Sequence, residues 1–378
     1  MDQVKGLMYC CAICFCSEHL WIPFYKIIRD LKHFKRQGRK REEKWCFELV
    51  FEAGKCYIIG QIREIKNQKF KKEKNIMSKV RFTAFSDLHH HPVWFKTDAP
   101  ERLTAIQQRA EEDGSEFLIH MGDFCHDVTV AEELLKQYRE FKVQGFHVFG
   151  NHEFDLNSYE GALKAYNLKC GYYYFDNSGF RFVVIDENYF SDFPGVIFHY
   201  SERNYFDHPT GRDWIDPEQI QWLKETILSS PYPCILCSHA TLEYEGGIKN
   251  REEVQEIIRA SQKLPGRVML CINGHYHRDN FNVIDNVAYL DLNSASFNWI
   301  PNPHYLYPAE WYQTIEGIGN QIIYTNPLSA TVTIDTDGNI EIAGSKGEFL
   351  CGVTMEMSGN KDGRRPCTPC ILDRKVRI

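Results

Sequence analysis

The 378-residue sequence predicts an α/β fold in which helices cover both faces of a sheet. Two observations lead to this prediction. From Val80 onward, short runs of β-branched and aromatic residues alternate with segments that begin at helix-capping residues. In addition, polar motifs rich in histidine and aspartate directly follow several of the apolar runs, which is where open α/β sheets place their ligands.

The first expected elements are three strands and two helices. A helix should begin near Ala99 with Asp98 as its N-cap, because aspartate accepts hydrogen bonds from the free N–H groups of a first turn. A second helix should open at the capping box Thr129–Glu132. The apolar runs that predict the strands are Val80–Phe85, Phe117–Met121 and His147–Phe149.

The later elements are predicted in the same way. Three turn sequences, Asn177-Ser178-Gly179, Asp285-Asn286 and Asp337-Gly338, predict β-hairpins. Asp216 and Asn250 each precede a helical segment and should cap it. The remaining strands are expected at Tyr172–Phe175, Phe180–Ile185, Cys234–Cys237 and Val268–Ile272.

Charge divides the chain into a basic and an acidic part. Residues 1–76 contain 17 Lys and Arg against 9 Asp and Glu, whereas the remainder contains 27 against 42. We expect the basic segment 1–76 to be either a disordered accessory arm or translated upstream sequence that is not part of the natural product. Residues 77–300 should form the main domain, and 301–378 a C-terminal extension whose β-hairpin packs on it.

Composition favours a globular protein of the cytoplasm without membrane contact. No apolar run approaches the roughly 20 residues that cross a bilayer. The first residues, from Met1 to Lys5, do not resemble a secretory signal. Most of the 14 cysteines lie in apolar runs such as Pro233–Cys237, where buried reduced thiols explain them better than disulfides do.

Five short motifs rich in metal ligands occur in order along the chain. Together they supply two aspartates, an asparagine and four histidines, enough to bind two metal ions, with His152 as one further histidine beside them. Each motif alone is a weak signal, but all five in this order predict a two-metal hydrolytic site. The motifs are Asp87-Leu88-His89, Gly122-Asp123, Gly150-Asn151-His152-Glu153, Ser238-His239 and Gly274-His275-Tyr276-His277.

Spacing within two motifs predicts how the ligands converge. Residues two apart in an extended segment point the same way, so Asp87 and His89 should face one cavity. The same holds for His275 and His277. Imidazole nitrogen and carboxylate oxygen suit zinc, manganese and iron. Two such ions about 3.5–4 Å apart can hold the attacking and leaving oxygens of an in-line displacement.

With these motifs, residues from about Val80 to Leu292 resemble the calcineurin-like metallophosphoesterases, a superfamily that includes purple acid phosphatases and class III cyclic-nucleotide phosphodiesterases. The resemblance implies a four-layer sandwich of two mixed β-sheets flanked by helices, with the catalytic domain at 77–300. It also implies two divalent or mixed-valence ions of manganese, iron or zinc. The implied ligands are Asp87, His89 and His277 for the first ion, Asp123 for both, and Asn151, His239 and His275 for the second, with His152 as catalytic residue.

The sequence departs from the family pattern three residues after Asp123. Purple acid phosphatases have a tyrosine ligand there, and many relatives have an aspartate that pairs with the catalytic histidine. Here the position is His126, followed by Asp127, so an iron(III)–tyrosinate centre is not expected. Of these two residues, we expect His126 to support the site, and we leave open which of them, if either, orients His152.

The expected function is hydrolysis of phosphate esters on small molecules. In this scheme a metal-bridged hydroxide attacks phosphorus and His152 assists the leaving group. A nuclease with the basic segment as its arm is the alternative, although an acidic body argues against nucleic acid. A non-catalytic scaffold on the same fold is a third possibility, but such proteins lose ligands and none is missing here. Sequence alone indicates no oligomeric state.

Two regions outside the motifs carry further expectations. The long segment from His199 to Trp214 is expected either to cover the site and select substrates or to be a solvated loop. Arg203 and Arg212 within it are candidate phosphate ligands. His120, inside an apolar run, is expected to be a hydrogen-bonded core histidine.

Overall fold

The computed structural model describes residues 45–52, 55–62, 78–193, 195–300, 304–354, 356–357 and 368–378. The chain divides into two compact units, Met1–Asn75 and Ile76–Ile378. In the first unit, β1 (Trp45–Glu52) and β2 (Lys55–Ile62) form an antiparallel hairpin that the sequence did not predict. The rest of the basic segment 1–76 lies outside the described residues.

The second unit contains two six-stranded mixed sheets. In the first sheet, β3, β4 and β5 run parallel, and β16, β17 and β18 continue it antiparallel from β3, so the C-terminal hairpin is hydrogen-bonded into the sheet. Its strands, in spatial order, are β18 (Arg374–Arg377), β17 (Asn339–Ala343), β16 (Ala330–Asp335), β3 (Lys79–Phe85), β4 (Phe117–Met121) and β5 (Gln144–Val148).

The second sheet has a parallel centre and antiparallel edges. Strands β13, β11, β10 and β7 run parallel, and hairpins add β12 and β6 at the two edges. The predicted hairpins at Asn177–Gly179 and Asp285–Asn286 are thereby confirmed. In spatial order the strands are β12 (Asn280–Ile284), β13 (Val287–Asp291), β11 (Val268–Asn273), β10 (Cys234–Cys237), β7 (Phe180–Val184) and β6 (Tyr173–Asn177).

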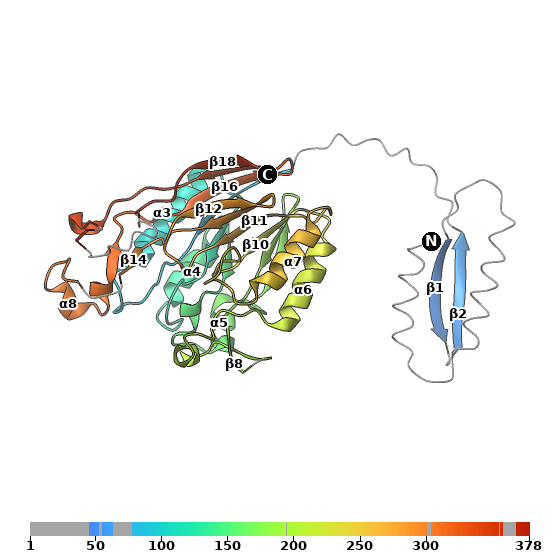
Figure 1. Ribbon diagram of the computed structural model, residues 1–378, viewed down its shortest axis with the longest axis horizontal. Helices are drawn as coiled ribbons and strands as arrows, with labels where there is room; N and C mark the ends of the chain where they lie inside the picture. Colours follow the sequence, from blue (N-terminus) through green and yellow to red (C-terminus); the bar gives the residue numbers. More distant parts are fainter. Residues whose placement is uncertain are drawn as a thin grey trace. The chain divides into compact units, whose positions relative to one another are not determined.

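Packing of the two sheets and five helices confirms the four-layer sandwich. Phe82 and Phe117 from the first sheet meet Phe182 from the second in the central core, with ring centroids 5.2 and 4.9 Å apart. Separate cores lie beneath the outer helices. The helices α3 (Ala99–Glu112), α4 (Glu132–Glu140) and α5 (Tyr159–Tyr166) cover the first sheet, and α6 (Pro217–Leu228) and α7 (Arg251–Ser261) cover the second (Figure 1).

Smaller elements complete the unit around the strand ends. A two-stranded ribbon and a short 3₁₀ helix follow β7, and a second ribbon with a helical turn precedes β16. These are β8 (Tyr189–Phe193), β9 (Val196–His199), η2 (Asn204–Asp207), β14 (Phe297–Trp299), α8 (Trp311–Thr314), η3 (Ile318–Asn320) and β15 (Gln321–Ile323), with η1 (Asn151–Phe154) after β5 and η4 (Leu350–Gly352) near the C-terminus.

The predicted helix starts are partly right. Asp216 caps α6, since its carboxylate accepts from Glu218 N–H at 2.6 Å. The capping box at Thr129–Glu132 is wrong: α4 begins at Glu132, and Asp127 accepts the Thr129 N–H and O–H instead. The helices after Asp98 and Asn250 begin where expected, but neither side chain makes a capping hydrogen bond.

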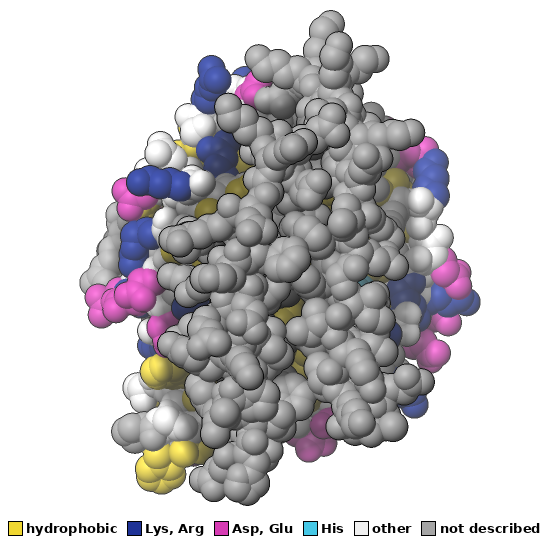
Figure 2. Space-filling model, turned by 90° about the vertical axis from the view of Figure 1, so that its right-hand side faces the viewer, with side chains coloured by type: hydrophobic (Ala, Val, Ile, Leu, Met, Phe, Trp, Pro, Cys, Tyr) yellow, Lys and Arg dark blue, Asp and Glu magenta, His cyan; other side chains and the backbone are white. Residues whose placement is uncertain are grey.

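The surface carries both signs of charge. Acidic and basic side chains are interspersed around the margin of the face drawn in Figure 2. Within the described parts of the chain, no helix combines the length and the hydrophobicity needed to cross a membrane. Cys234 and Cys237, from the apolar run singled out in the sequence, are buried free thiols as predicted.

Candidate metal centre

Loops at the strand ends of both sheets meet at one place. Asp87 N–H, after β3, donates to Gly122 O, after β4, at 3.0 Å. In the second sheet, Gly274 N–H donates to His239 O at 3.0 Å and so joins the loops after β11 and β10. His275 N–H then donates to Asp87 Oδ2 at 3.1 Å and links the two sheets. The motifs therefore converge from separate strands, as predicted.

The ligand-bearing loops are not extended. Positive φ angles place Asp87 (56°), His89 (54°), Asp123 (59°), His275 (70°) and His277 (49°) in the left-handed region. The predicted geometry of these loops is therefore wrong. Asp87 and His89 still reach one group, whereas His275 and His277 reach different groups. Left-handed backbone is costly outside glycine, and the hydrogen bonds between the loops offset that cost.

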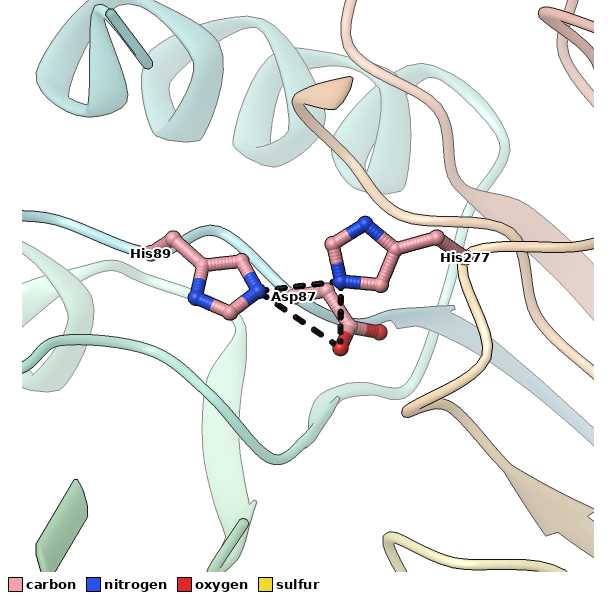
Figure 3. Close-up of side chains that lie close together, drawn as sticks. All are labelled: Asp87, His89 and His277. Atoms are coloured by element: carbon pink, nitrogen blue, oxygen red, sulfur yellow. Dashed lines mark hydrogen bonds and ion pairs between the residues drawn. The ribbon is translucent and has the colours of Figure 1, made fainter. Parts of the chain in front are cut away.

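Asp87, His89 and His277 form the first group (Figure 3). Asp87 Oδ1 lies 3.2 Å from His277 Nε2 and 3.8 Å from His89 Nε2. The two Nε2 atoms are 3.0 Å apart, and all three side chains are buried. Two nitrogens and one carboxylate oxygen that converge in this way are a donor set suited to a divalent metal.

Asp123, His239 and His275 form the second group, with one potential donor atom from each within 4.8 Å of the others. Asp123 Oδ2 lies 3.0 Å from His239 Nε2 and 3.8 Å from His89 Nε2, so one oxygen faces both groups. This position is compatible with the predicted bridging role of Asp123. Burial lowers the pKa of His239, but the charge and hydrogen bond of Asp123, together with the charges of Asp87 and Glu187, raise it above its usual value, so the site attracts positive charge.

Unpaired buried oxygens show that the side chains fit a cation. Asp87 Oδ1 and Asn151 Oδ1 have no hydrogen-bond donor among the described residues. Leaving such atoms unsatisfied is costly in a protein interior. Asn151 opens η1 next to His152, whose N–H donates to Asp123 Oδ1 at 2.8 Å. Ion binding would satisfy both oxygens.

The histidine tautomers also fit metal binding. His239 Nδ1–H donates to Met121 O at 2.7 Å, and His277 Nδ1–H donates to Phe297 O at 2.6 Å. A carbonyl oxygen can only accept, so each ring carries its proton on Nδ1 and turns the Nε2 lone pair toward the site. This is the usual support of a metal-binding histidine.

Glycines of the motifs allow the loops to approach this closely. A Cβ atom on Gly150 would lie 2.3 Å from Asp123 Oδ1. A Cβ atom on Gly274 would lie 1.7 Å from Ser86 Oγ and 2.7 Å from Asp87 Oδ2. A side chain at either position would therefore displace a carboxylate of the site.

His152 is held by Asp155, a residue that the sequence reasoning missed. Asp155 Oδ2 accepts from His152 Nδ1 and from His126 Nδ1, both at 2.7 Å. His126 Nε2 in turn lies 3.1 Å from His89 Nδ1, so His126 contacts the site as expected but does not itself hold His152 Nδ1. Burial lowers the pKa of His152, yet the charges of Asp155 and Asp123 outweigh it and raise it to about 9.

Glu153 connects the loops after β4 and β5. Its Oε2 accepts from Gly150 N–H at 2.7 Å and Asp123 N–H at 2.9 Å, and its Oε1 accepts from Tyr166 O–H at 3.0 Å. The carboxylate is fully buried. The sequence placed Glu153 within a motif but assigned it no role, because its partners are backbone groups that a sequence does not reveal.

The segment from His199 to Trp214 reaches the site. Tyr205 O–H donates to Asp155 Oδ1 at 2.6 Å. The Arg203 guanidinium lies 4.9 Å from the Trp94 ring centroid and is exposed, whereas Arg212 Nε donates to Tyr205 O at 2.9 Å within the segment. Arg212 thus has a structural partner.

The environment of His120 differs from its prediction. The ring is fully buried in the first sheet, as expected, but neither ring nitrogen has a hydrogen-bond partner among the described residues. Its neighbours are the Phe85 and Phe124 rings, with centroids 5.0 and 4.9 Å away. Burial lowers the pKa of His120, so the ring is neutral among these aromatic groups.

Comparisons with known proteins identify the fold and the family. A dimetal phosphatase from Danio rerio has a similar structure, with a TM-score of 0.51 and 15% sequence identity, over 72% of this chain and 98% of that one. The GAP50 anchor of the inner membrane complex of Plasmodium aligns over 80% of this chain and 89% of its own, with a TM-score of 0.46 and 12% identity. At such identities the first likeness concerns the fold alone. No curated protein matches the sequence.

The family rests on a different comparison, which spans the whole candidate site. The family model described as calcineurin-like phosphoesterase matches residues 80–279. This range includes every predicted ligand, His152 and the newly found Asp155. The chain therefore belongs to the calcineurin-like phosphoesterase family and is a metal-dependent phosphoesterase.

Proposed function

We propose that this protein hydrolyses phosphate esters of small molecules at a centre of two metal ions. The observation that carries the proposal is the position of Asp123, whose Oδ2 faces both groups of donors. Asp87, His89 and His277 would hold one ion, and Asn151, His239 and His275 the other. When bound, such ions bind phosphoryl oxygens and lower the pKa of water, so that a nucleophile is available near neutral pH.

His152 is the proposed proton donor to the leaving oxygen. Its Nδ1–H points at the Asp155 carboxylate at 2.7 Å, which leaves Nε2 for the substrate. The imidazole side chain is 21% exposed, whereas the Asp155 side chain behind it is 3% exposed. A buried carboxylate that orients an imidazole and stabilises its charged form is a common arrangement in proton transfer.

Charge supports a small substrate. The residues after position 76 carry 15 more acidic than basic groups, and nucleic-acid affinity depends on Lys and Arg contacts with phosphates. The basic residues before position 77, on which a nuclease would rely, lie largely outside the described residues. The described residues therefore do not favour nuclease activity, and the experiment below tests for it directly.

The test measures the metal content of the full chain and its hydrolysis of phosphate esters. Two variants with substitutions in one loop are compared with wild type. With manganese, zinc or iron, we expect hydrolysis of p-nitrophenyl phosphate or its bis ester and about two ions per chain. Asp123→Asn should lose about 10³-fold in kcat, since it removes a charge that both groups face. Asp127→Asn is the matched control, because Asp127 accepts from Thr129 and faces neither group.

Three outcomes decide between the candidates. Ester turnover that Asp123→Asn abolishes and Asp127→Asn retains would support the proposal. Cleavage of single-stranded DNA or RNA, with no turnover of either small ester, would favour the nuclease. A folded wild-type protein that binds no metal and hydrolyses nothing would contradict both.

A further inference from the structure

We infer that Tyr205 is a positioning residue for proton donation, acting on His152 through Asp155. This inference rests on the proposed function of His152. Tyr205 lies 50 positions beyond Asp155 in the sequence and outside every motif, yet its O–H donates to Asp155 Oδ1 at 2.6 Å. No sequence pattern predicted the contact.

The Asp155 carboxylate divides its two oxygens between different partners. Oδ2 accepts from His152 and His126, and Oδ1 accepts from Tyr205. Tyr205 is 1% exposed and Asp155 3% exposed, so water does not readily replace the hydroxyl. With both oxygens held, the carboxylate cannot rotate away from His152 without breaking a buried hydrogen bond, which is costly.

Tyr205 is itself held in place from several sides. Its ring stacks on that of Tyr200, with ring centroids 4.2 Å apart. The Arg212 guanidinium lies 4.8 Å from the Tyr205 ring centroid. The surrounding segment is hydrogen-bonded to the loop that carries Asp155, because Arg203 N–H donates to Phe154 O at 2.9 Å. A rigid tyrosine fixes the carboxylate better than a mobile one would.

The chemical consequence depends on the leaving group. Hydrolysis forms a bond from water oxygen to phosphorus and breaks the bond to the leaving oxygen, which takes a proton from His152 Nε2. The proton released by the attacking water passes to solvent, and His152 is reprotonated from solvent after the product leaves. A weakly basic leaving group such as p-nitrophenolate needs little proton donation, whereas an alkoxide needs much. The arrangement therefore fits alkyl phosphate esters as natural substrates.

The experiment compares Tyr205→Phe with wild type on two monoesters, p-nitrophenyl phosphate and glycerol 2-phosphate, using the full chain loaded with manganese. Tyr205→Phe keeps the ring and its stacking but removes the hydroxyl. We expect kcat to fall about tenfold for the glycerol ester and less than about twofold for the nitrophenyl ester. KM and metal content should be unchanged for both.

Two reference variants separate positioning from a general structural effect. Tyr200→Phe removes a hydroxyl from the same ring stack, one that donates to Asp213 at 3.0 Å, so any effect should be equal for both esters. In His152→Ala, as in Tyr205→Phe, kcat should fall more for the glycerol ester than for the nitrophenyl ester, and both the fall and the difference should be larger. Thermal unfolding checks that each variant is folded.

The outcomes for the inference and for the proposed function are distinct. If wild type hydrolyses both esters and Tyr205→Phe loses equally on both, the positioning role is wrong and the phosphoesterase proposal stands. An equally selective loss in Tyr200→Phe would also overturn the positioning role. If wild type hydrolyses neither monoester, the proposed function itself is in error for monoesters.

Discussion

The two sheets contribute different chemistry to the site. The loops after the first sheet supply both aspartates, Asp87 and Asp123, together with His89 and Asn151. The loops after the second sheet supply imidazoles alone among the predicted ligands. Both carboxylates among the predicted ligands therefore come from the first sheet, and the second sheet adds imidazole nitrogens. Because each of the two groups assigned to the ions, Asp87–His89–His277 and Asp123–His239–His275, contains residues of both sheets, neither sheet completes either of these two groups without the other.

The first way to break this relation is to weaken the packing of one sheet on the other. Phe182→Ala should lower the free energy of unfolding by about 3–5 kcal/mol, because this ring fills the core between Phe82 and Phe117. Urea denaturation measures the change. Val283→Ala, on an exposed position of the same sheet, is the control and should stay within about 0.5 kcal/mol. A loss below about 1 kcal/mol for Phe182→Ala would mean that other contacts hold the sheets together.

The second test replaces, in separate variants, one metal ligand from each sheet within the first group. Asp87→Asn should weaken manganese binding by about 100-fold, and His277→Gln by about tenfold, because only the first change removes a charge. Isothermal titration of the two variants gives both dissociation constants. An equal loss of manganese affinity in both variants would show that the aspartate charge contributes no more to binding than the imidazole does.

The third and smallest effect concerns ions that connect the sheets. At a concentration ten times its Kd, manganese should raise the free energy of unfolding by about 1.4 kcal/mol, and EDTA should abolish the gain. The gain should be reduced in Asp123→Asn and also in His239→Ala, one ligand from each sheet. Full stabilisation retained in His239→Ala would show that the first sheet binds the ions alone.

The sequence predicted those features that depend on local pattern. Apolar runs identified β3, β4, β10 and β11 to within about one residue, and the motifs identified the residues that gather at their ends. Asp216 was recognised as a cap because the bond it makes is two residues away. Each of these depends on neighbours in the chain, which a sequence displays directly.

Features that depend on tertiary contacts were missed or mistaken. Thr129 does not cap a helix: its N–H and O–H both donate to Asp127, and α4 begins only at Glu132. Asp155 was overlooked, although it stands three residues after His152, where one helical turn brings side chains together. Tyr205 offered no local signal at all, since its partner lies 50 positions away. The left-handed loops depend on hydrogen bonds between separate strands, and spacing alone suggested an extended chain.

The pairing of β16 with β3 has a consequence for how the chain folds during its synthesis on the ribosome. Arg81 in β3 bonds to Thr333 in β16 across 252 positions. At about 5–20 residues per second, roughly 10–50 s pass between synthesis of the two strands. During that interval β3, which leads directly into Asp87 and His89, has one edge without its final neighbour. The nascent chain must therefore keep this edge from pairing wrongly until β16 has been synthesised.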